Sequence, residues 1–149
     1  MPTLIETLLT NRAVAVLARV ILTFPFWGSG LDKLINFSGG VAEMRQFGLE
    51  PALLFNIAVL TTQLVGSALI ISGRYVWLGA GALGVFTALT IPVVHRFWTM
   101  EGAAALHAFH TAAEHIGMIG GLITVSILAA RTRSARSGGI TMPRVVMAR

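Results

Sequence analysis

Residues 51–94 read PALLFNIAVLTTQLVGSALIISGRYVWLGAGALGVFTALTIPVV, two long apolar stretches joined only by Gly73-Arg74-Tyr75. Each stretch has about the 20 residues that a helix needs to cross the hydrocarbon core of a bilayer. So short a connection forces the two helices to be antiparallel neighbours. Gln63, near the middle of the first stretch, is expected to form a hydrogen bond to another helix. The segment predicts a helical hairpin that spans a membrane twice.

Two further apolar stretches of similar length lie outside this hairpin, at residues 14–31 and 111–130. The mean hydropathy of the chain is +0.79, and only 11% of its residues are charged. A soluble domain of 149 residues would need more polar surface than this composition provides. The sequence therefore predicts an all-α protein, an integral membrane four-helix bundle.

The connection between the first and second spans carries a helical signal of its own. Val41, Met44 and Phe47 recur at the spacing of one helix face, with polar residues between them. Gly48 is expected to end this helix, and Pro51 to begin the second span. We predict a short amphipathic helix between spans one and two, on the outer surface or capping the bundle.

The net charge of +5 is concentrated after the last span. This segment holds five arginines, namely Arg131, Arg133, Arg136, Arg144 and Arg149. Positive residues near membrane spans remain in the cytoplasm, so we expect a multi-pass protein of the inner (plasma) membrane with both termini cytoplasmic. The tail then determines orientation, and no nucleic-acid partner is expected. We divide the chain into a transmembrane domain, residues 1–130, and a basic, flexible cytoplasmic tail, residues 131–149.

Several kinds of chemistry are excluded by residue content. The chain has no cysteine, which rules out disulfides, thiolate nucleophiles, iron–sulfur cluster ligation and covalent c-type haem on this chain. No phosphate-binding glycine loop and no Ser-His-Asp order is present. Because no polar segment is long enough for a soluble catalytic domain, any catalysis would take place in the bundle or at its mouth. Whether the protein is an enzyme stays open.

All four histidines fall between His95 and His115. On a helix, His107, His110 and Glu114 are spaced i, i+3 and i+7 and therefore share one face, with His115 to one side. His95 at the end of span three and Lys33 at the end of span one are expected to reach the same outer mouth. The sequence thus predicts a polar cluster at that end of the bundle.

Three interpretations of this cluster remain open. The first is structural, with Glu114 paired to Lys33 or to a histidine. The second is a quinone pocket, in which a histidine donates a hydrogen bond to a carbonyl between apolar walls from Phe97, Trp98 and Phe109. The third is a metal ion or b-type haem, although the spacing matches no standard metal signature. The metal-ligand candidates are His107, His110, Glu114 and His115, with His95 as a further haem or metal ligand.

Four short segments resemble DoxX-like membrane proteins. Arg19 is followed by FPFWGSGLDKLINF at residues 24–37, which is similar to the family pattern F-x-x-x-G-x-x-K-x-x-x-F in the first helix. The others are FGLEPALL (47–54), QLVGSALIISGRYVWLGA (63–80) and HRFWTMEG (95–102). The resemblance covers about residues 14–130 and implies a four-helix bundle of the DoxX type.

The resemblance also implies a role in membrane redox systems, since some members resemble a thiosulfate:quinone oxidoreductase subunit. It implies ligand-binding positions at Arg19, Lys33, His95 and Trp98. The chain departs from the family at Glu114 and His115, where many relatives have Lys-Asn. We expect a membrane subunit that anchors a partner oxidoreductase, or forms a homo-oligomer, and binds quinone at the outer mouth. The alternative is a non-enzymatic structural or small-solute transport protein.

Overall fold

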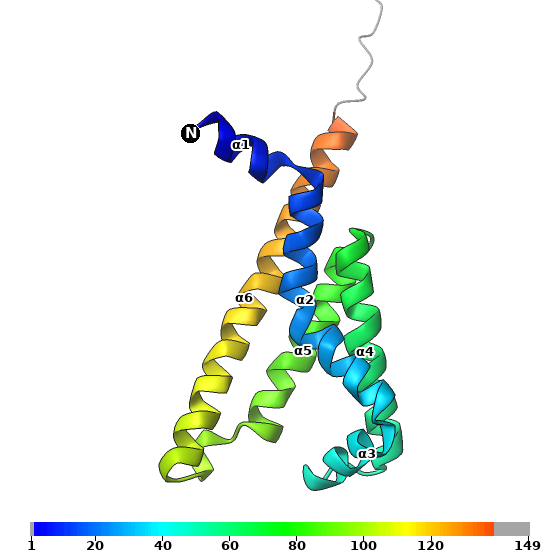
Figure 1. Cartoon of the computed structure of the whole chain (residues 1–149), viewed down its shortest axis with the longest axis vertical. Helices are drawn as coiled ribbons and strands as arrows, with labels where there is room; N and C mark the ends of the chain where they lie inside the picture. Colours follow the sequence, from blue (N-terminus) through cyan, green and yellow to red (C-terminus); the bar gives the residue numbers. More distant parts are fainter. Residues whose placement is uncertain (1, 139–149) are drawn as a thin grey trace, which may run out of the picture.

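The computed structural model describes residues 2–138, which form helices and connecting turns without a strand (Figure 1). Four of the described helices are long and apolar enough to cross a membrane. The predicted all-α membrane architecture is therefore confirmed. The elements in order are α1 (Thr3–Thr10), α2 (Arg12–Ile35), α3 (Phe37–Gln46), α4 (Ala52–Ser72), α5 (Val76–Val94), the 3-10 turn η1 (Phe97–Thr99) and α6 (Gly102–Gly138).

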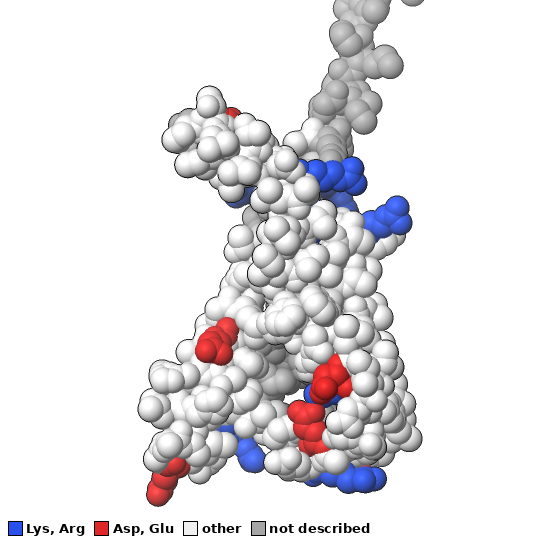
Figure 2. All heavy atoms as spheres, viewed as in Figure 1, with Lys and Arg blue, Asp and Glu red and all other residues white. Residues whose placement is uncertain are grey.

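Helix α4 lies between α2 and α5, and α6 packs mainly along α5 (Figure 1). We call the end of the bundle that holds α3 and η1 the α3 end. The opposite end, which holds α1 and the last turns of α6, is the terminal end. Figure 2 shows basic side chains at the terminal end, charges of both signs at the α3 end and a largely uncharged belt between them. This distribution is that of a protein whose middle section faces lipid.

The α4–α5 hairpin has the antiparallel arrangement that its short connection predicts. Gly73 takes a left-handed conformation, with φ of 73°, and so reverses the chain directly after α4. Gly66 and Gly79 let the two backbones approach closely. A Cβ atom on Gly79 would lie 2.6 Å from the carbonyl oxygen of Gly66. The two glycines therefore set the distance between the two central helices.

The apolar core fills the terminal half of the bundle. It comprises Phe26, Ile70, Val76, Ala80, Leu83, Leu122 and Val125. Ile70 and Leu83 are fully buried between α4 and α5. This half of the molecule is consequently closed, and the α3 end is where the helices leave space.

Helix α3 confirms the predicted amphipathic helix between spans one and two. The Asn36 side chain accepts a hydrogen bond of 3.2 Å from the backbone N–H of Gly39 at its start. Gly48, with φ of 72°, follows its end. Met44 is buried on its apolar face, and the helix packs against α4. Helix α3 thus covers the ends of α2 and α4 at this end of the bundle.

Helix α6 is longer than the apolar stretch 111–130 from which it was predicted. It spans Gly102–Gly138 without a proline, about 55 Å at a rise of about 1.5 Å per residue, against a bilayer core of about 30 Å. Alanines at residues 103–105 and 129–130 favour helix on both sides of the apolar stretch. The helix continues through the first part of the segment predicted to be a flexible tail. Residues 139–149, with Arg144 and Arg149, lie outside the described residues.

Candidate ligand cavity

A cavity of about 490 Å³ lies at the α3 end, between α2, α3, α4, α5 and α6. Its walls are mainly apolar, and its largest apolar side chains are Phe26, Met44, Phe47, Phe55, Phe86 and Met118. Figure 2 shows the molecule hollowed at this end. The volume and the apolar lining are those of a small-molecule site, in which a few polar groups determine which ligand binds.

The first polar group of the cavity is a row of side chains from three helices. Lys33 Nζ lies 2.7 Å from Glu43 Oε2 and donates a hydrogen bond of 3.4 Å to Ser29 Oγ. Ser29 and Lys33 are one helical turn apart on α2 and therefore share a face. Gln63 on α4 donates a hydrogen bond of 3.3 Å from Nε2 to the same Ser29 oxygen. The interhelical hydrogen bond predicted for Gln63 is confirmed.

The second polar group is a pair of histidines on the other wall. His95 directly follows α5, and its backbone N–H donates to the carbonyl of Ile91 at 3.0 Å. His115 projects from α6, and the two imidazole rings meet edge to face with centroids 4.9 Å apart. Both residues line the cavity. The α5–α6 packing therefore places two groups that can donate, accept or carry a proton beside the same space.

Two polar atoms at the cavity lack a hydrogen-bond partner among the described residues. These are Gln63 Oε1 and His115 Nδ1, both buried. A buried polar atom without a partner costs about 1–3 kcal/mol. The two residues come from α4 and α6, which stand on opposite sides of the molecule (Figure 1). A ligand with polar groups at two ends would satisfy both atoms.

The structure brings together three of the residues selected from the sequence. Lys33, His95 and His115 line the cavity, whereas the other candidates lie elsewhere. His107, His110, Glu114 and Trp98 are exposed. Trp98 belongs to η1 and packs edge to face on Phe97, with ring centroids 5.0 Å apart. Arg19 lies toward the terminal end, where its guanidinium approaches Gly73.

The packing of α6 explains why His115, and not His107 or His110, faces the cavity. The buried face of α6 is formed by Ala108, Ala112, Leu122 and Val125. His115 is three residues after Ala112 and so lies on this buried face, while His110 and Glu114 turn away from it. The expectation that His115 lies to one side of the polar face is correct. However, the face with His107, His110 and Glu114 is exposed. The small residues Ala108 and Ala112 were the sequence signal that the other face of the helix packs inward.

The interpretation that Lys33 pairs with Glu114 is wrong. Lys33 pairs with Glu43 of α3, and Glu114 is exposed on α6. Glu43 and Ser29 were missed as cavity residues because neither stands at a specified position of the family pattern or in the histidine cluster. Two signals were available in the sequence. Glu43 is next to Met44, which belongs to the apolar face of the predicted amphipathic helix, and Ser29 is four residues before Lys33, which puts the two on one helix face. Among residues 2–138, no group of three or more His, Asp or Glu side chains is arranged to hold a metal ion.

The family model for DoxX matches residues 14–96, more than half of the chain. The protein belongs to the DoxX family. The matched region of this DoxX protein runs from α2 to the end of α5 and includes Lys33, Glu43, Gln63 and His95. His115 and the exposed polar residues of α6 lie beyond the match. Comparisons with curated proteins and with solved structures gave no match.

Proposed function

We propose that this DoxX protein binds the head group of a membrane quinone in the cavity, as the integral membrane subunit of a redox complex. It anchors a partner oxidoreductase in the inner membrane, with both termini in the cytoplasm, as the arginine distribution predicts. The observation that carries the proposal is the pair of unpartnered atoms, Gln63 Oε1 on α4 and His115 Nδ1 on α6, at a cavity whose walls are mainly apolar.

A quinone ring matches this arrangement chemically. It is flat and apolar, with oxygens at opposite positions that accept hydrogen bonds when oxidised and donate them when reduced. Gln63 Oε1 can accept a hydrogen bond from a quinol hydroxyl, and Gln63 Nε2, which donates to Ser29, has a second hydrogen that can be donated to a quinone carbonyl. His115 Nδ1 can donate or accept, according to the tautomer of the ring. The aromatic and thioether side chains of Phe26, Met44 and Phe86 provide apolar contacts for a ring.

Proton supply is the task for which Lys33 and Glu43 are suited. Reduction of a bound quinone to a quinol takes two electrons, here from the partner enzyme, and two protons. Lys33 is buried, whereas the Glu43 side chain is 41% exposed. The ion pair therefore connects the cavity to the aqueous surface at the α3 end. His95 and His115 hold exchangeable protons on the opposite wall.

The position of the cavity favours this proposal over solute transport. The polar groups of the cavity are confined to the half of the bundle near the α3 end. The terminal half holds the apolar core, with Ile70 and Leu83 at 0% exposure, and its buried hydroxyl groups on Thr23 and Ser67 donate to backbone carbonyls of their own helices. This apolar core lies between the polar groups of the cavity and the terminal end of the bundle.

Quinone binding to the purified full-length protein tests the proposal directly. A short-chain ubiquinone analogue is titrated into protein in lipid nanodiscs, and bound ligand is measured by equilibrium dialysis. Gln63→Leu removes the unpartnered amide and should weaken binding about tenfold. Thr61→Val, at an exposed position on the same helix outside the cavity, is the control and should bind as wild type. Saturable binding that Gln63→Leu leaves unchanged, or no binding to wild type, would overturn the proposal.

A further inference from the structure

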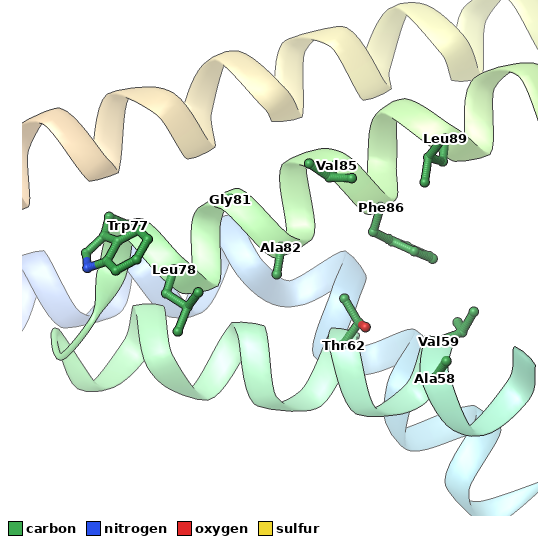
Figure 3. Close-up of a pocket in the computed structure, with 10 residues that line it drawn as sticks. All are labelled: Ala58, Val59, Thr62, Trp77, Leu78, Gly81, Ala82, Val85, Phe86 and Leu89. Carbon is green, nitrogen blue, oxygen red and sulfur yellow. The ribbon is translucent and has the colours of Figure 1, made fainter. Parts of the chain in front are cut away.

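A second hollow lies on the lipid-facing side of the α4–α5 hairpin. This groove has a volume of about 530 Å³ and is lined by ten residues (Figure 3). Only Thr62 and Trp77 among them carry a polar side-chain atom. The groove offers almost no hydrogen bonds, so a ligand would bind there through apolar contacts alone.

The groove and the cavity meet at shared residues. Val59, Phe86 and Leu89 line both. Figure 3 shows Phe86 reaching from α5 toward α4, near Val59 and at the opposite end of the groove from Trp77. These three side chains therefore border both spaces, and the cavity and the groove are neighbours.

The groove is long enough for an extended chain. Its residues on α5 run from Trp77 to Leu89, a distance of about 18 Å at about 1.5 Å per residue. It starts near the middle of the bundle, where it meets the cavity, and runs toward the terminal end. The polar end of such a ligand would lie beside Lys33 and Gln63, and its apolar end beside Trp77.

We infer that the groove binds the polyisoprenoid tail of the quinone whose head group occupies the cavity, with the tail leaving the bundle between α4 and α5 past Phe86. This inference rests on the proposed function and narrows it, because it makes the ligand a long-tailed quinone. In a bilayer the tail gains little from leaving lipid. The favourable free energy of tail binding comes from close apolar contacts along the groove. The groove also fixes the path by which the quinone enters and leaves the cavity.

Two glycines of α5 provide a matched test. Gly81 lines the groove and not the cavity, whereas Gly84 lines neither, and a Cβ atom at either position would meet open space. Gly81→Leu fills the groove, and Gly84→Leu makes the same chemical change on the same helix outside it. Binding of a tail-less quinone and of a decaprenyl quinone is measured for the full-length wild type and both variants in lipid nanodiscs.

We expect Gly81→Leu to weaken binding of the decaprenyl quinone about fivefold and to leave binding of the tail-less quinone unchanged. Gly84→Leu should change neither. If the tail-less quinone binds and Gly81→Leu binds the decaprenyl quinone as wild type does, the tail assignment is overturned while the head-group site stands. If neither quinone binds to wild type, the proposed function is overturned and the tail assignment with it.

Discussion

The Lys33 ammonium nitrogen lies 2.7 Å from Glu43 Oε2, and this ion pair connects the last turns of α2 to the capping helix α3. Lys33 is only 8% exposed, so its charge depends on this partner and on Ser29. A second ion pair nearby, between Arg45 and Glu50, has a nitrogen–oxygen distance of 3.7 Å, and both of its side chains are exposed. The two pairs allow a buried and an exposed ion pair to be compared at one end of the molecule.

Glu43→Gln should destabilise the protein by about 1–3 kcal/mol, because it leaves the Lys33 charge buried without a counter-ion. Glu50→Gln, which breaks the exposed pair, should cost less than about 1 kcal/mol. Thermal unfolding of both variants in the same detergent measures the difference. Adding Lys33→Met to Glu43→Gln should recover part of the loss. Equal unfolding temperatures for the two single variants would show that the buried pair is unimportant for stability.

His115→Ala should weaken quinone binding about fivefold to tenfold, because His115 Nδ1 is one of the two unpartnered atoms at the cavity. His110→Ala, on the exposed face of the same helix, should bind as wild type. Equilibrium dialysis with a short-chain quinone gives both dissociation constants. The opposite ranking would mean that the ligand binds outside the cavity, on the exposed face of α6.

Gly79→Ala should destabilise the α4–α5 hairpin by about 1–3 kcal/mol, because the new Cβ atom would lie 2.6 Å from the carbonyl oxygen of Gly66. Gly81→Ala on the same helix adds the same methyl group into open space. It should be neutral or slightly stabilising through helix propensity. Thermal unfolding of the two variants tests this contrast, which fails if Gly79→Ala unfolds at the same temperature as Gly81→Ala.

The absence of cysteine makes the topology directly measurable by single-cysteine labelling. Thr99→Cys lies in η1 at the α3 end, and Arg74→Cys lies in the α4–α5 turn toward the terminal end. With cytoplasmic termini, an impermeant maleimide should label Thr99→Cys in intact cells. It should label Arg74→Cys only after the inner membrane is permeabilised. The reverse labelling pattern would place the termini outside the cytoplasm.

The spans and their order followed from the sequence because both depend on local properties. Apolar length identifies a membrane helix, and the short connection at Gly73 makes α4 and α5 antiparallel neighbours. The amphipathic spacing of Met44 and the position of Gly48 likewise predicted α3. The full length of α6 did not follow, because its ends are polar and depend on helix propensity, which hydropathy does not measure.

The cavity was decided by the tertiary structure. Lys33, His95 and His115 could be selected as site residues from the sequence, but their grouping with Ser29 and Glu43 around one space could not, because these residues come from different helices. Which side of a helix faces inward depends on what packs against it. On α6, Ala108 and Ala112 are buried, so His115 on the same face turns toward the cavity and Glu114 turns away. The sequence determined that polar groups gather at the α3 end, and only helix packing determined which of them share a space.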